Sequence, residues 1–99
     1  MNTETTLAWA LADAASACFT DDEHVVIFTA LGAGESPLAI VRILRAAARA
    51  RHPLPRSLVT QLAQWLDGYA GHNFERRIRA LLDDYISSGF VVTNPSAAH

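Results

Sequence analysis

The strongest constraint on the fold is the spacing of glycine and proline, which divides the 99 residues into five short segments. Gly32, Pro53, Gly71 and Gly89 each follow a stretch in which apolar residues recur at helical intervals. A glycine just after a helix, or a proline soon beyond it, is a common stop signal. We therefore expect an all-α fold, a compact bundle of five short helices around a single core. The predicted helices span about 3–18, 21–31, 36–51, 55–70 and 73–88.

The second segment is the ambiguous one, because residues 24–30 are apolar and rich in β-branched side chains. Such a run fits a strand as well as a helix. The only other strand-like run, 90–93, is too short to build a sheet with a buried face. We therefore favour a helix, which begins after Thr20 with acidic residues in its first turn. Because it is apolar on all sides, we expect it to be the buried central helix.

The composition indicates one globular domain. The chain is 51% hydrophobic and 18% charged, which is typical of a folded protein and not of a disordered one. We expect residues 1–93 to form a single helical domain and residues 94–99 to be a disordered tail. Eighteen alanines and eight arginines with no lysine are typical of a GC-rich bacterial genome. No segment has the pattern of a signal peptide or a membrane span, so we expect a cytoplasmic protein without membrane contact.

Charge is segregated along the chain. Residues 1–35 hold six acidic residues and no arginine, whereas residues 36–66 hold five arginines and no acidic residue. Arg42, Arg45 and Arg49 are spaced so that they project from one side of the predicted helix 36–51. Two readings stay open. In the first, the arginines meet the acidic first third inside the fold, or both regions are simply solvated surfaces. In the second, the arginine row faces an acidic partner.

The turn before that helix offers a second reading of the same arginines. Ala30, Gly34, Ile40 and Ile43 stand at a spacing that resembles the helix-turn-helix pattern, over about twenty residues. The resemblance implies that helix 36–51 is a recognition helix. Arg42 and Arg45 would then contact bases or phosphates, and Arg49 a phosphate. The chain departs from the pattern at two positions. Gly32 lies where the pattern requires the first helix of the motif, and Glu35 occupies a turn position that is usually apolar.

Trp9 lies on the polar side of the predicted helix 3–18. At 100° per residue it lies beside Asp13 and Ser16, away from the stripe formed by Leu7 and Leu11. A tryptophan on the polar side is either half-buried by a neighbouring helix or available to a partner, where aromatic residues are enriched. Together with Trp9, three alanines form a small-residue surface that a second helix could approach closely: Ala8, Ala12 and Ala15.

No set of residues has the spacing of a catalytic or metal site. The acidic run at 21–23 and the four histidines lack metal-ligand spacing, and Cys18 is the only cysteine. We therefore expect no enzymatic activity, no cofactor and no metal. The sequence favours a small non-enzymatic helical module for protein–protein interaction or self-association, with Trp9, Arg42, Arg45 and Arg49 as partner-binding candidates. The alternative is a helix-turn-helix nucleic-acid-binding protein that uses helix 36–51.

Overall fold

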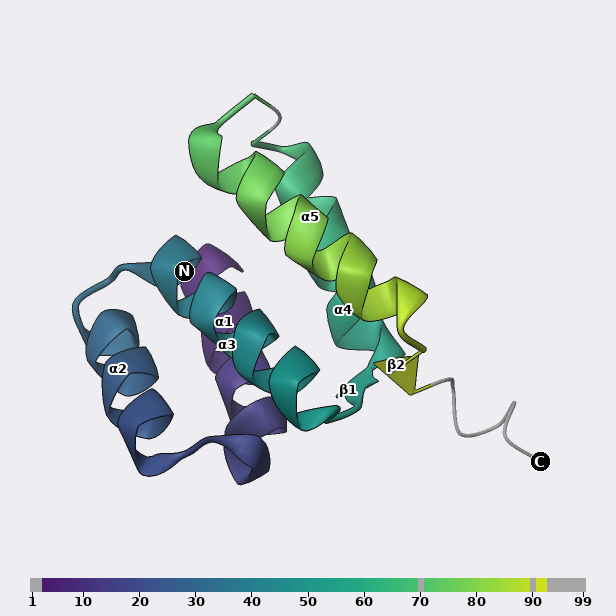
Figure 1. The fold of residues 1–99 in the computed structure, drawn as a ribbon. Coiled ribbons are helices and arrows are strands. Elements are labelled where there is room, and N and C mark those ends of the chain that lie inside the picture. Colours follow the sequence, from purple (N-terminus) through teal and green to yellow (C-terminus); the bar gives the residue numbers. More distant parts are fainter. Residues whose placement is uncertain (1–2, 70, 90, 93–99) are drawn as a thin grey trace.

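The expected all-α bundle is confirmed by the computed structural model, which describes residues 3–69, 71–89 and 91–92 (Figure 1). The helices differ from the predicted ones by at most a few residues at each end. Their bounds are α1 Thr3–Ala15, α2 Asp21–Gly32, α3 Ser36–Ala50, α4 Arg56–Asp67 and α5 Asn73–Ser87. A short 3-10 turn, η1 (Ser16–Cys18), extends α1. The predicted disordered tail, 94–99, lies outside the described residues.

Local capping explains where α2 begins and ends. The Thr20 hydroxyl oxygen accepts a hydrogen bond from the Glu23 backbone N–H at 3.1 Å, and a Glu23 carboxylate oxygen accepts one from the Thr20 N–H at 2.8 Å. This reciprocal capping box satisfies two backbone donors at the helix start. α2 includes Gly32, so the helix ends one residue later than the predicted range of 21–31. The chain instead reverses at Gly34, which has a φ of 79° that an L side chain adopts only with strain.

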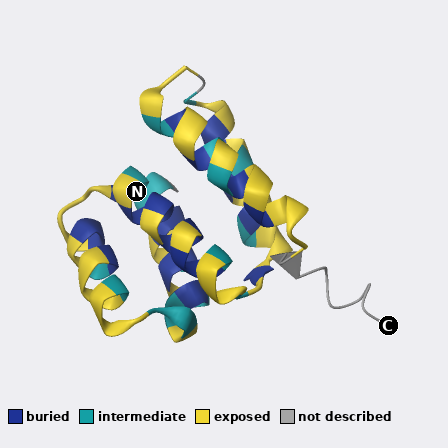
Figure 2. Ribbon diagram, in the orientation of Figure 1, coloured by how far each residue is buried: buried dark blue, intermediate teal, exposed yellow. Residues whose placement is uncertain are grey.

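The central helix is α3 and not, as predicted, the helix of residues 21–31. It packs on α1, α2 and α5, whereas α2 lies at the edge of the molecule (Figures 1 and 2). Only one side of α2 is buried, through Ile27, Ala30 and Leu31. On α3, by contrast, alanines share the buried surface with large aliphatic side chains, so neighbouring helices can approach closely from several directions. The buried residues of α3 are Ser36, Ala39, Ile40, Val41, Ile43, Leu44, Ala46 and Ala47.

The C-terminal half is a helix pair, with α4 packed on α1 and α5 packed on α3. Trp65 and Tyr85 are buried here. One small addition was not foreseen. Two two-residue strands, β1 (Leu54–Pro55) and β2 (Val91–Val92), pair in parallel and join the segment that follows α5 to the α3–α4 link. Among the described residues, no helix combines the length and apolarity needed to cross a bilayer.

Candidate interaction surface

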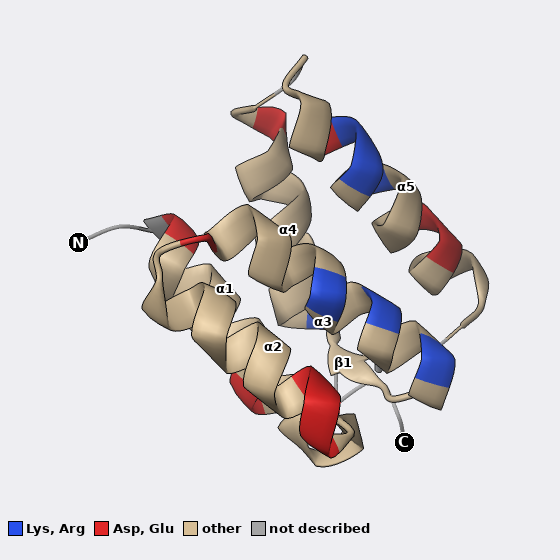
Figure 3. Cartoon of the chain, turned by 60° about the vertical axis from the view of Figure 1, so that its left-hand side comes forward, with Lys and Arg blue, Asp and Glu red and all other residues tan. Residues whose placement is uncertain are grey.

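The three arginines of the predicted row do lie along one exposed side of α3, between α2 and α5 (Figure 3). They differ in their partners. Arg49 donates to both carboxylate oxygens of Glu23, at 2.7 and 3.2 Å, and also to the Cys18 carbonyl oxygen at 3.2 Å. Arg42 and Arg45 form no hydrogen bond or ion pair with any described residue. Of the two readings, the internal one therefore holds for Arg49, and the other two guanidinium groups are unpaired.

Glu23 links the start of α2 to the end of α3. Its carboxylate accepts from the Thr20 backbone N–H and from the Arg49 guanidinium, and both contacts hold the pKa of Glu23 below its usual value. Glu23 therefore both caps α2 and joins the start of α2 to the end of α3. The contact adds to the buried packing of α2 on α3 through Ile27, Ala30 and Leu31.

A groove of about 270 Å³ separates α2 from the arginine row. Asp22 and Glu23 stand on the α2 wall, and Arg42 and Arg45 stand on the α3 wall. Apolar side chains line it between the charged walls, where Ile27 is buried and Val26 is 40% exposed. The groove therefore has Asp22 and Glu23 on one side, Arg42 and Arg45 on the other, and Val26 as its exposed apolar side chain.

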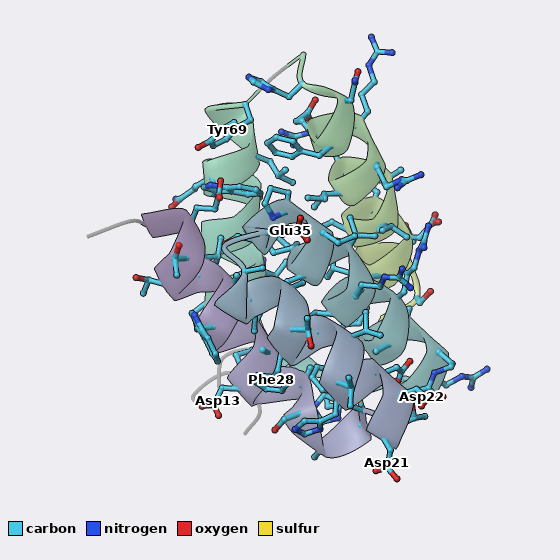
Figure 4. All side chains as sticks on the ribbon, turned by 90° about the vertical axis from the view of Figure 1, so that its left-hand side faces the viewer. Asp13, Asp21, Asp22, Phe28, Glu35 and Tyr69 are labelled. Carbon is cyan, nitrogen blue, oxygen red and sulfur yellow. The ribbon has the colours of Figure 1, made fainter. Side chains whose placement is uncertain are left out.

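Trp9 is 43% exposed and packs on Phe28 of α2, with ring centroids 5.7 Å apart. Both rings, together with Ala10 and Asp13, border a shallow hollow on the other side of α2. Figure 4 looks onto this side and shows Phe28 between Asp13 and the carboxylates at the start of α2, Asp21 and Asp22. Trp9 is thus half-buried by a neighbouring helix and, at the same time, accessible to a partner.

The small-residue surface of α1 is not accessible. Ala8, Ala12 and Ala15 are fully buried where α1 packs on α3, so the helix that approaches them belongs to the same chain. The sequence also missed the exposure of Val25, which is 66% accessible on the outer side of α2. The sequence of α2 could have indicated this exposure, because a helix that is apolar on all sides exposes apolar side chains when it lies at the edge of the molecule.

The remaining polar groups are dispersed. In the described part of the chain, no three histidine, cysteine or acidic side chains are grouped to hold a metal ion. His24 stacks on Phe28 at 4.8 Å, whereas a ring nitrogen of His52 lies 2.9 Å from the Ala14 carbonyl oxygen. Cys18 is half-buried, and burial raises the pKa of its thiol.

A comparison with known proteins gives no relative. No protein-family model, no curated protein and no solved structure matches this chain.

Proposed function

We propose that this protein is a small non-enzymatic module that acts by binding another protein chain with the outer side of α2. The observation that supports this proposal is the continuity of exposed apolar side chains there. Trp9 packs on Phe28, and Val25 lies one helical turn from Phe28 on the same side of α2. Val26 projects about 100° further round the helix, toward the groove. Scattered exposed apolar residues are ordinary, but a contiguous patch rimmed by charges is typical of an interaction surface.

The charged rim supports specificity. Asp21 and Asp22 stand at the start of α2 and form no ion pair with the described residues, and Arg42 and Arg45 stand unpaired across the groove. Unpaired charges around an apolar patch orient a partner and exclude partners with the wrong pattern.

The way α2 and α3 lie gives no support to the nucleic-acid alternative. In a helix-turn-helix the two helices cross at about 90–120°. Glu23 is nine residues from the end of α2 and Arg49 is thirteen from the start of α3, or about 14 Å and about 20 Å along the two axes. A crossing at 90–120° would separate them by about 17–24 Å along the axes. Their side chains instead meet at 2.7 Å, so α2 and α3 form an antiparallel pair. We therefore make no nucleic-acid proposal.

The test is affinity capture with two matched variants, followed by binding of the purified partner. Trp9→Gln/Val25→Gln replaces apolar side chains of the proposed surface, and Leu38→Gln/Ile86→Gln replaces two of similar exposure on α3 and α5. We expect wild type and the Leu38/Ile86 variant to retain the same partner, and the Trp9/Val25 variant to bind it at least about tenfold more weakly. Equal binding by all three folded proteins would overturn the proposal.

A further inference from the structure

We infer that the partner's binding segment carries an acidic side chain that docks between Arg42 and Arg45, in the groove between α2 and α3; this inference rests on the proposed function and names the chemistry of its partner. Two guanidinium groups and two carboxylates line this groove. Glu23 is already neutralised, because it pairs with Arg49. Arg42, Arg45 and Asp22 form no ion pair with any described residue, so the groove retains one net positive charge.

The arginine pair and Asp22 stand at opposite ends of the groove. Because α2 and α3 are antiparallel and Glu23 meets Arg49, the level of each residue follows from the helical rise of about 1.5 Å per residue. From that ion pair toward the start of α3, Arg45 lies about 6 Å away and Arg42 about 10 Å away. Asp22 lies about 1.5 Å from it in the opposite direction. The arginine pair is therefore clear of the one unpaired carboxylate of the groove.

The charges on neighbouring elements leave the first half of α3 positive. The first turns of α3 and α5 border one hollow, which is also lined by Arg77, and this guanidinium forms no ion pair with a described residue. Asp84 lies seven residues further along α5, about 10 Å from Arg77, and so stands level with Arg49 and the last turn of α3 (Figure 3). Glu35 precedes Arg42 by seven residues, also about 10 Å. Exposed charges at that separation are largely screened at physiological salt.

The arginine pair fits one acidic side chain and not a continuous polyanion. Arg42 and Arg45 are three residues apart on one side of α3, so both guanidinium groups can reach the same carboxylate. A phosphate backbone would extend past them, toward Asp22 at one end and Glu35 at the other, and would be repelled there. A basic side chain would be repelled by the arginines themselves. The groove therefore favours an aspartate or glutamate of a protein segment over a nucleic acid.

Val26 joins the arginine pair to the proposed surface of α2. It lines the groove, is partly exposed and lies at about the level of Arg45, whereas Val25 beside it faces outward. A partner helix on the outer side of α2 can cover both valines and place an acidic side chain over the arginines, which stand one interhelical distance of about 8–10 Å away. Burial of the valines supplies the attraction that exposed ion pairs lack, and the ion pairs set the orientation.

The test is the binding of two helical peptides to the full chain, measured by fluorescence anisotropy at low and at physiological salt. Both peptides have about 14 residues, or four turns, with leucine on one side; beside the leucines, one carries glutamate and the other glutamine. We expect the wild type to bind the glutamate peptide at least about fivefold more tightly at low salt, and the difference to shrink as salt rises. Net charge cannot produce this preference, because the chain carries −2 and repels an acidic peptide.

Two matched variants assign the preference to the arginine pair. In Arg42→Gln/Arg45→Gln, the two peptides should bind equally, because the guanidinium groups that distinguish them are gone. Arg56→Gln/Arg76→Gln makes the same change of net charge, from −2 to −4, at exposed positions on α4 and α5, and it should keep the preference. Circular dichroism checks that both variants are folded.

Four results would overturn the inference: no binding of the glutamate peptide up to about 1 mM, no preference for it in the wild type, an undiminished preference in Arg42→Gln/Arg45→Gln, or tighter binding of a random DNA duplex than of this peptide. The proposed function fails on different evidence. If Trp9→Gln/Val25→Gln loses the captured partner but the glutamate preference is absent, the proposed function stands and this inference fails. If that variant keeps the partner, the proposed function fails, whichever peptide binds.

Discussion

The Tyr85 hydroxyl is the contact whose removal gives the clearest stability prediction. The side chain is fully buried on α5, its O–H donates to the His52 carbonyl oxygen at 2.5 Å, and its oxygen accepts from the Leu54 N–H at 2.7 Å. Tyr85→Phe leaves the Leu54 N–H and the His52 carbonyl without this partner. A buried polar group left unsatisfied costs about 1–3 kcal/mol. We expect the free energy of unfolding to fall by about 2 kcal/mol, which for a domain of this size lowers Tm by about 8–16 °C.

The assay is urea and thermal unfolding followed by far-UV circular dichroism. Tyr69→Phe is the control, because it removes the same atom from a half-buried tyrosine whose hydroxyl forms no hydrogen bond with the described residues. It should change the free energy of unfolding by less than about 0.5 kcal/mol. If Tyr85→Phe is as stable as Tyr69→Phe, the assignment of this hydroxyl as the link between α5 and the α3–α4 connection is refuted.

The same hydroxyl predicts an alkaline limit. Burial raises the pKa of Tyr85 above its usual value of 10.0, so the unfolded chain loses this proton before the folded one does. Its contribution to stability is therefore complete below about pH 10 and falls as the pH rises further. Tyr85→Phe should remove this part of the alkaline loss. An identical slope in wild type and variant would contradict the expectation.

Three further predictions concern α2, α3 and α4. Hydrogen bonds hold the pKa of Glu23 below its usual value of 4.5 in the folded protein. The contribution of Glu23 to stability is therefore present above pH 4.5 and is lost as the pH falls through the lower folded pKa. Glu23→Gln should flatten the acid unfolding curve, and an unchanged curve would contradict this prediction. Arg51 has a left-handed φ of 53°, so Arg51→Gly should stabilise the fold by about 0.5–1 kcal/mol in urea, and a loss of stability would contradict this. Leu62→Ala, at a fully buried position, should cost about 2–5 kcal/mol, whereas a near-neutral result would show that α4 does not contribute this residue to the core.

The helices were predictable because their signals are local. The Thr20 cap, the acidic first turn of α2 and the glycine and proline stop signals act within a few residues, and the helical bounds lie within a few residues of them. The reversal at Gly34 instead of Gly32 shows the remaining error of such rules. Two nearby glycines satisfy the same pattern, and the backbone uses the one that fits the path into α3.

The order of burial was not predictable from a single helix. The composition of α2 indicated a central helix, but burial depends on which sides the other helices occupy, and α3 is the helix they surround. The sequence also predicted only in part which arginines of the row form ion pairs. The segregation of charge indicated an internal pairing or a free surface, and the structure contains both, because Glu23 reaches Arg49 but neither Arg42 nor Arg45.

The outer side of α2 as a protein-binding surface is the central claim, and amide NMR spectra of the labelled protein with and without its captured partner test it most directly. We predict shift changes concentrated at Trp9, Val25 and Phe28, with the amides of α4 unchanged. Spectra that superimpose with and without the partner, or changes confined to α4 and α5, would contradict it.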